Sequence, residues 1–422
     1  MKKYLHAADI LLPDFESDAF RKWATIACDQ FTSEPEYWES VKETVSGAPS
    51  TLSLILPEVY LDRRDELTPG IHAAMENYLL TVLKDRGRNG MIYLSRVQSD
   101  GAVREGIVAC IDLEDYDYTK GSDSLIRATE GTVLERIPPR VAVRRGAPLE
   151  LPHVMLLIDD PNGTVIEPIG REASGYEAAY DFDLMLEGGH VTGKWIPASR
   201  YEGLNRALDA LISKDALSER YRNSGVSPLL FAVGDGNHSL ASAKAHYEEV
   251  KTELGVDAAK DHPARYALIE LVNLHSPALK FEPIYRVVFG ADGEDLLSAL
   301  RAYANCDSRP KNDRLQEVVW VAEHEEGTIV LKNPSSNLPV GSLQIFLDEY
   351  VKDHPEVTID YIHGEDTLRS LSKNGAVGFL FSGMEKNALF ETVIFDGSLP
   401  RKTFSMGHAR DKRYYLESRK IR

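Results

Sequence analysis

Apolar residues along this chain follow two periodicities, and each predicts a type of element. Recurrence every three to four residues predicts helices over 68–86, 201–214, 239–254, 293–304, 341–352 and 364–373. Alternation and short apolar runs predict strands over 91–97, 107–113, 154–159, 164–167, 229–233, 266–272, 317–322, 327–332, 357–361 and 376–382. Residues 15–46 read as helical pieces separated by a polar break over 27–35, where Thr32 or Ser33 is expected to cap a helix that starts at Pro35. The succession favours an α/β or mixed α+β architecture.

The length of the chain bounds its domain organisation. A chain of 422 residues exceeds one small core and suggests two or three domains. Glycines and acidic residues near 285–295 mark the best candidate boundary. We therefore expect a core over 1–288 and a C-terminal α/β domain over 289–422.

Composition and charge exclude several classes of protein. A net charge of −18 argues against nonspecific binding of nucleic acid, which needs clustered Lys and Arg. No apolar run approaches the ~20 residues that span a bilayer, and acidic residues interrupt the N-terminus before a signal peptide could form. The cysteines, at 28, 110 and 306, show neither metal spacing nor a disulfide framework. These features predict a cytoplasmic protein with no nucleic-acid or membrane partner.

The segment 228–244 carries the strongest local signal. Apolar residues 229–233 predict a buried strand, Gly234 and Gly236 bracket Asp235, and a helix follows from about Ser239. Polar side chains would then surround the first turn of that helix, where unpaired N–H groups and the helix dipole favour an anion. A phosphate-bearing ligand fits such a corner, although most corners of this kind only cap a helix.

The residues of this corner suggest particular roles. Asp235 would hold Mg²⁺ or orient a hydroxyl, and His238 would donate to a phosphoryl oxygen or shuttle a proton. The spacing matches neither a P-loop nor a dinucleotide fingerprint. Lys244, two turns into the helix, either reaches back toward the site or is a solvated lysine.

A second group lies in the break between the N-terminal helices. Cys28 precedes Asp29, and Glu34 follows. Thiolate chemistry at Cys28 would need a base, and the sequence shows none. Asp29 is the better candidate for a catalytic or metal-binding acid, because polar breaks concentrate functional side chains.

Arginines form a third group. Arg127 opens the run Arg-Ala-Thr-Glu-Gly-Thr, and Arg140 lies downstream among further arginines. Arginine suits bidentate phosphate or carboxylate contacts, and surface ion pairs are the alternative. Two C-terminal stretches, 360–366 and 399–408, supply further His, acidic and basic residues, either as a loop that closes over a phosphate or as ordinary surface.

Together these segments make the chain resemble the family called domain of unknown function 1015. The family's Asp-Gly-His-His-Arg corner stands here as Asp235-Gly-Asn-His-Ser239. Its earlier and later blocks are matched by Arg127, Glu130, Thr132, Arg140, the run 152–160, the stretch 361–366 and the loop 400–403. Asn237, Ser239 and Thr129 depart from the pattern. The departure at Ser239 removes an arginine, so Lys194, Lys244, Arg127 or Arg401 would have to supply the cation.

The family's corner is similar to one in the ParB nuclease-like and sulfiredoxin-like superfamily, where the turn binds nucleotide phosphates. The resemblance implies a ParB/sulfiredoxin-like nucleotide-binding core, with free-serine kinases as the closest enzymatic analogy. Sulfiredoxin-like repair is disfavoured because it needs a cysteine in the turn. DNA binding of the ParB kind is disfavoured by the acidity of the chain.

Our leading hypothesis is therefore a nucleotide-dependent phosphotransferase that uses ATP or ADP with Mg²⁺ and acts on a small hydroxylated molecule. The expected catalytic residues are Asp235, which would also bind the metal, His238, Asp29 and Glu34. The expected ligand-binding residues are Gly234, Gly236, Asn237, Ser239, Lys244, Arg127, Glu130, Arg140 and Arg401. The alternative is a non-catalytic nucleotide or metabolite sensor that uses the same corner.

Overall fold

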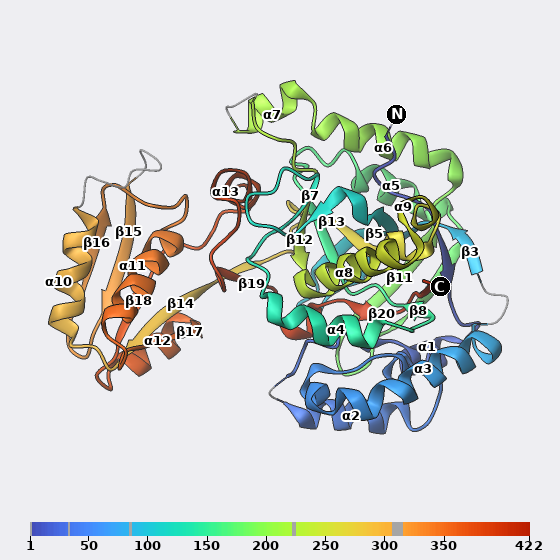
Figure 1. Ribbon diagram of the computed structural model, residues 1–422, viewed down its shortest axis with the longest axis horizontal. Coiled ribbons are helices and arrows are strands. Elements are labelled where there is room, and N and C mark those ends of the chain that lie inside the picture. Colours follow the sequence, from blue (N-terminus) through green and yellow to red (C-terminus); the bar gives the residue numbers. More distant parts are fainter. Residues whose placement is uncertain (1, 33, 84–86, 222–224, 306–314) are drawn as a thin grey trace. The chain divides into compact units, whose positions relative to one another are not determined.

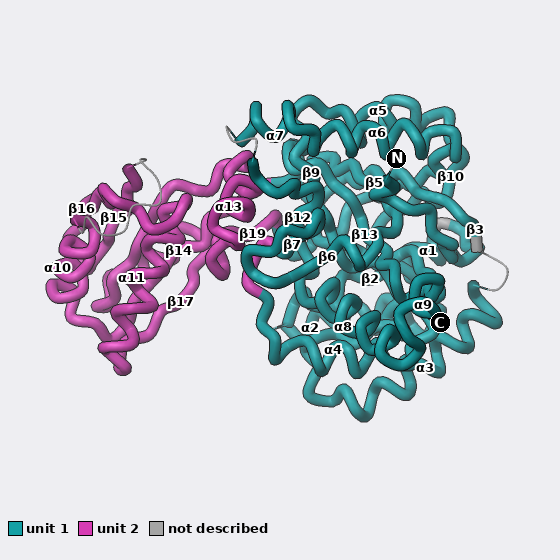
Figure 2. Tube along the Cα trace, turned by 45° about the horizontal axis from the view of Figure 1, so that its top comes forward, with its two compact units in different colours: residues 1–128, 132–279, 408–422 teal, residues 129–131, 280–407 magenta. Residues whose placement is uncertain are grey.

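The protein is described by a computed structural model that covers residues 2–32, 34–83, 87–221, 225–305 and 315–422. Cys306 and the expected cap Ser33 lie outside the described residues. Contacts divide the chain into two compact units (Figure 2). Unit 1 comprises residues 1–128, 132–279 and 408–422, and unit 2 comprises 129–131 and 280–407.

Unit 1 is built on a mixed nine-stranded sheet (Figure 1). Its strands, in spatial order, are β10 (Ala178–Asp183), β11 (His190–Trp195), β4 (Ile92–Val97), β5 (Val103–Asp112), β13 (Tyr266–Asn273), β9 (Met155–Ile158), β12 (Phe231–Asp235), β7 (Ile126–Ala128) and β6 (Tyr116–Asp117). Three two-stranded ribbons join β1 (Ala8–Leu11) to β3 (Gly87–Gly90), β2 (Thr25–Ile26) to β20 (Tyr414–Tyr415) and β8 (Leu149–Glu150) to β21 (Arg419–Lys420). The last two ribbons pair the C-terminal segment with earlier parts of the chain.

The central strands are apolar on both faces because helices cover both faces. Along β13, Leu268 enters one hydrophobic cluster and the adjacent Ile269 enters another. The first cluster includes Trp23 and Trp38 from the N-terminal helices, and the second includes Tyr247 from α8. The helices of unit 1 are α1 (Ser17–Trp23), α2 (Pro35–Val45), α3 (Arg64–Thr81), α4 (Ile137–Arg144), α5 (Ile166–Glu172), α6 (Tyr201–Leu211), α7 (Lys214–Tyr221), α8 (Asn237–Leu254) and α9 (Val256–Ala259).

Buried charges attach the C-terminal segment 408–422 to unit 1. Arg413 Nη1 lies 3.0 Å from Glu270 on β13, and its other nitrogen pairs with Glu417. Arg104 on β5 also lies 3.0 Å from Glu270, and it donates to the Asp411 carbonyl at 2.6 Å. These side chains are at most 2% exposed. Because each buried charge faces an opposite one, burial of the segment depends on this network.

Unit 2 carries its own sheet, flanked by helices. The strand order is β16 (Glu326–Leu331), β15 (Gln316–Val321), β18 (Val377–Leu380), β14 (Phe281–Phe289) and β17 (Thr358–His363), with β19 (Phe404–Met406) paired to β14. The helices are α10 (Gly293–Ala304), α11 (Pro339–Asp353), α12 (Glu365–Ser372) and α13 (Ala388–Asp396).

The mixed α/β architecture predicted from the sequence is confirmed, with one element wrong and one boundary displaced. Residues expected as a strand over 164–167 instead lead into helix α5, which begins at Ile166. The Asp160 carboxylate accepts hydrogen bonds from the N–H groups of Thr164 and Val165 at 2.6 and 2.8 Å, so these groups are not available to a neighbouring strand. The expected boundary at 288/289 falls within β14, and residues 408–422 lie in unit 1.

In the described part of the chain, no helix combines the length and apolarity that crossing a bilayer requires.

The charge network makes a prediction about stability. Replacing Arg413 by Met should lower the free energy of unfolding by about 3–5 kcal/mol, because Glu417 is left buried without its cation. Arg422→Met is the matched control, since its ion pair with Glu76 is exposed and should contribute at most about 1 kcal/mol. Urea denaturation followed by circular dichroism measures both. Equal effects of the two substitutions would contradict the anchoring role.

Candidate functional site

The predicted corner lies between β12 and α8, as expected. Gly236 precedes the helix with φ 81° and ψ 28°, a left-handed conformation that favours glycine. A Cβ added there would lie 3.1 Å from the His153 ring and from the Val154 backbone. No side chain caps the start of this 18-residue helix. The first-turn N–H groups of α8 are therefore left to water or to a ligand.

Polar atoms around the first turn include buried ones without a protein partner. Within the described ranges, Asn237 Oδ1 and Thr132 Oγ1 are buried and accept or donate no hydrogen bond. Asp235 accepts from the Gly236 N–H at 3.1 Å, and its other oxygen lies 3.4 Å from Lys412 Nζ. The C-terminal segment thus brings a cation to the corner. Buried polar atoms without partners are costly, so the corner suits a polar ligand.

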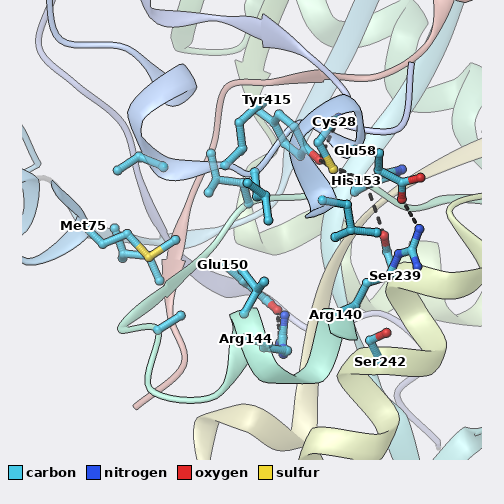
Figure 3. Close-up of a pocket in the computed structure, with 18 residues that line it drawn as sticks. Cys28, Glu58, Met75, Arg140, Arg144, Glu150, His153, Ser239, Ser242 and Tyr415 are labelled. Atoms are coloured by element: carbon cyan, nitrogen blue, oxygen red, sulfur yellow. Dashed lines mark hydrogen bonds and ion pairs between the residues drawn. The ribbon is translucent and has the colours of Figure 1, made fainter. Parts of the chain in front are cut away.

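His153, two residues before β9, connects the corner to the N-terminal break. Its Nδ1 lies 2.9 Å from the Tyr415 hydroxyl, 3.3 Å from Ser239 Oγ and 3.9 Å from Cys28 Sγ (Figure 3). On the other side of the ring, Nε2 lies 3.2 Å from Asp29 Oδ2. The buried imidazole of His153 thereby contacts three other segments of the chain, which contain residues 28–29, Ser239 and Tyr415.

His153 and Asp29 each stabilise the charged form of the other. Burial alone would lower the pKa of His153. The charge of the Asp29 carboxylate and its hydrogen bond outweigh burial and hold that pKa well above its usual value. Burial would likewise raise the pKa of Asp29, yet His153 and the hydrogen bond from Gln30 bring it well below its usual range. The two side chains therefore form an imidazolium–carboxylate pair at neutral pH.

His238 is in the opposite state. Burial, with the nearby charges of Arg140 and Arg136, lowers its pKa to about 4. Its Nε2 accepts a hydrogen bond from the Val133 N–H at 3.4 Å. A neutral imidazole that accepts at Nε2 carries its proton on Nδ1. His238 is consequently a neutral donor at the start of α8.

A cavity of about 180 Å³ adjoins His153 (Figure 3). Cys28, His153, Ser239 and Tyr415 form part of its wall. Most of the remaining wall is aliphatic, contributed by Leu54, Ile55, Leu56, Leu61, Met75, Val143, Ala147, Leu149 and Leu151. The cavity therefore combines a polar end with an apolar body.

The other predicted residues of unit 1 have protein partners or lie on the surface. Arg127 donates to the carbonyls of Ser124, Ser227 and Pro228 at 2.8–3.1 Å, which gives its guanidinium a structural use. Arg140 pairs with Glu58 at the cavity. Lys244 donates to the Leu113 carbonyl and lies 2.9 Å from Glu248. Glu34 is exposed at the start of α2 and caps no N–H. Their roles in binding or catalysis stay predictions.

Glu130 and Arg401 belong to unit 2. Glu130 bridges to Leu399, whose N–H donates to the Thr129 carbonyl at 2.6 Å. Arg401 lies 3.8 Å from Asp348 and over the Tyr361 ring, 5.4 Å from its centroid. The part of these two residues in binding stays a prediction.

Sequence reasoning missed His153, Lys412 and Tyr415. His153 directly precedes an apolar strand and matches no catalytic spacing. Lys412 and Tyr415 lie beyond 399–408, the last stretch that the sequence singled out. The pairing of β20 with β2 places Tyr415 opposite Thr25, three residues before Cys28. Such long-range pairing leaves no local signal.

The predicted metal ligand is a single carboxylate. In the portions of the chain that the structure describes, no three His, Cys, Asp or Glu side chains are arranged to hold a metal. Asp235 is the acid at the corner, and a bound Mg²⁺ would complete its shell with phosphate oxygens and water, as Mg²⁺ commonly does.

The chain belongs to the family described as protein of unknown function (DUF1015), whose model matches residues 14–350. The chain matches none of the curated proteins. Solved structures similar to it include free serine kinase in complex with AMP (12% identity, TM-score 0.35, covering 73% of this chain and 90% of that one) and a mutant of that kinase with ADP (11%, 0.37, 73% and 91%). A conserved hypothetical protein from Pyrococcus furiosus is also similar (10%, 0.34, 75% and 95%). Family membership assigns no activity, because the family is described as one of unknown function.

The two histidines should titrate in opposite directions. The lowered pKa of His238 makes its contribution to stability full above about 6.5 and lost as the pH falls toward 4. The raised pKa of His153 makes its contribution full below about 6.5 and lost as the pH rises through its folded value. NMR of ¹⁵N-labelled histidine should show His238 neutral at pH 5.5 and His153 protonated at pH 7.5, with His238→Gln and His153→Gln assigning the signals. The reverse order would contradict the described pairing.

Proposed function

We propose that unit 1 is a nucleotide-dependent phosphotransferase with a ParB/sulfiredoxin-like core, acting on a small hydroxylated molecule. The observation that carries the proposal is the uncapped first turn of α8, entered through a left-handed glycine and flanked by Lys412 and the unpartnered Asn237 Oδ1. These features supply hydrogen-bond donors, a close approach to the backbone and a cation at one place. A nucleotide phosphate is the ligand that uses all three.

The backbone would hold the phosphate. Helix N–H groups and the dipole of α8 favour a dianion at residues 236–239. Gly236 lets the ligand approach closely, because a side chain there would be strained at φ 81°. Lys412 is 13% exposed and reaches Asp235 from the C-terminal segment. In our proposal it provides the positive charge that the family pattern carries at the position of Ser239.

The side chains have separate roles in the proposed transfer. His238 is neutral, with Nδ1–H free to donate to a phosphoryl oxygen where charge develops. Asp235 would orient the acceptor hydroxyl and hold Mg²⁺, which when bound neutralises phosphate charge. Asp29 is a weak base because its pKa is lowered, so it would position the acceptor rather than deprotonate it fully. Phosphoryl transfer makes little demand on a strong base.

Nucleotide binding tests the corner directly. ATP or ADP with Mg²⁺ should raise the melting temperature of the protein, and isothermal titration should give a dissociation constant for each nucleotide. Lys412→Ala should weaken binding at least tenfold, about 1.4 kcal/mol, because a charge-assisted contact is lost. Lys420→Ala, which removes an exposed lysine of the same segment, is the control. Equal affinities for the two variants would contradict the role of Lys412.

Catalysis is tested at Asp235. Asp235→Asn keeps a hydrogen-bond acceptor for the Gly236 N–H but removes the charge, so turnover should fall at least 100-fold while the melting temperature changes little. Phosphoryl transfer from ATP or ADP is measured across a panel of hydroxylated metabolites, with exposed Asp257→Asn as the control. A large loss of stability with unchanged nucleotide affinity would refute the assignment.

A second function, nucleotide sensing without chemistry, is favoured by two ion pairs. Asp235 pairs with Lys412 and Asp29 pairs with His153, so both candidate acids are already neutralised by protein cations. Under this alternative, wild-type protein binds ATP or ADP but consumes neither with any metabolite of the panel. Turnover with one metabolite excludes it.

A further inference from the structure

Cys28 has a histidine beside it that the sequence did not reveal. The thiol sulfur lies 3.9 Å from Nδ1 of His153, and Nε2 of the same ring lies 3.2 Å from the Asp29 carboxylate. The order is therefore thiol, imidazole, carboxylate, with the two ring nitrogens facing different partners. This constellation activates nucleophiles on several unrelated folds.

We propose that Cys28 is a nucleophile that accepts the acyl group of an ester or thioester bound in the adjoining cavity, with His153 as its acid–base partner and Asp29 as the residue that positions His153. The inference goes beyond the phosphotransferase and does not depend on it. It rests on the contacts of Cys28 and on the chemistry of the cavity wall.

The volume and lining of the cavity determine which acyl group it can hold. Its volume of about 180 Å³ exceeds the roughly 150 Å³ in which an apolar cavity holds benzene. Met75 lies on the opposite side of the cavity from Cys28 (Figure 3), and aliphatic side chains line the space between. Arg140 and Arg144, which also contribute to the wall, are each paired with a glutamate. A neutral, apolar chain of about six carbons fits such a lining better than a charged group.

The neighbouring hydroxyl supports the chemistry. Tyr415 donates to Cys28 Sγ at 3.2 Å and lies 2.9 Å from His153 Nδ1. Burial raises the pKa of Tyr415 well above its usual value, so its hydroxyl stays protonated and remains a donor. A donor beside the attacking sulfur is in place to stabilise the negative charge that develops on the carbonyl oxygen of the acyl group.

The proposed reaction consumes only the acyl compound and water. Because His153 already carries a proton on each ring nitrogen, the attack starts from the Cys28 thiolate beside this imidazolium. The thiolate attacks the acyl carbon and forms a carbon–sulfur bond, the bond from that carbon to the leaving oxygen or sulfur breaks, and His153 gives its Nδ1 proton to the leaving group. Water then attacks the thioester, the now neutral His153 takes a proton from that water, and the sulfur leaves as the thiolate with the carboxylic acid released.

The test uses full-length protein carrying Cys306→Ser, with p-nitrophenyl hexanoate and p-nitrophenyl acetate as probes. We expect a burst of one p-nitrophenolate per chain with the hexanoate and a hexanoyl adduct on Cys28 by peptide mass spectrometry. Cys28→Ser should abolish both. Cys110→Ser is the matched control and should retain both, because burial raises the pKa of Cys110 to about 12 and its thiol does not line the cavity.

Two further variants separate catalysis from structure. His153→Gln should slow acylation at least 100-fold, and Asp29→Asn should shift the pH profile of acylation while circular dichroism shows an unchanged fold. The other charged or titratable groups near this pair are Tyr415 and Lys412, the latter paired with Asp235. Val143→Phe, which fills the cavity, should slow hexanoate acylation at least tenfold and leave acetate acylation unchanged.

Several results would overturn the inference. They are a hexanoyl adduct on another residue, no adduct at all, acylation that His153→Gln leaves unchanged, or equal rates with hexanoate and acetate. Nucleotide affinity is measured in the same variants. Because Cys28→Ser leaves the first turn of α8 intact, loss of acylation with retained nucleotide binding distinguishes this site from the phosphate corner.

Discussion

The buried carboxylate of Glu270 is the constraint on which the rest of unit 1 depends. It lies on a central strand, fully buried, and two guanidinium groups neutralise it: Arg104 from β5 and Arg413 from the C-terminal segment. Burial alone would raise its pKa, but these cations lower it, so the carboxylate stays charged. Breaking such a network is costly because a charge is left without a partner. The network therefore fixes the C-terminal segment against the sheet and carries Lys412 and Tyr415 to the site.

The site that results places two histidines in opposite charge states around the start of α8. His238 is kept neutral by burial and nearby arginines, whereas His153 is kept charged by Asp29. The separated pKa values are the basis on which we propose a donor role for His238 and an acid–base role for His153. Two sites adjoin these histidines. The proposed phosphate site would use the backbone of α8, whereas the aliphatic cavity is lined by Cys28 and His153.

Local patterns foretold most of the helices and strands and the corner itself. The runs that became β13 and α10 are matched almost residue for residue, because apolar periodicity reports burial directly. The error at 164–167 has a local cause, since the Asp160 side chain accepts hydrogen bonds from two N–H groups that a strand would donate to its neighbour. The site was less predictable. Nothing in the sequence near Cys28 pointed to His153, 125 residues away, or to Tyr415, 387 residues away, because sheet order brought them together.

The central claim is that the first turn of α8, completed by the C-terminal segment, binds a nucleotide phosphate. A crystal structure of the protein soaked with ADP and Mg²⁺ tests it most directly. We predict a phosphate group within hydrogen-bonding distance of the backbone N–H groups of residues 237–239 and of Lys412 Nζ. Nucleotide bound elsewhere, with only water at this turn, would contradict the account.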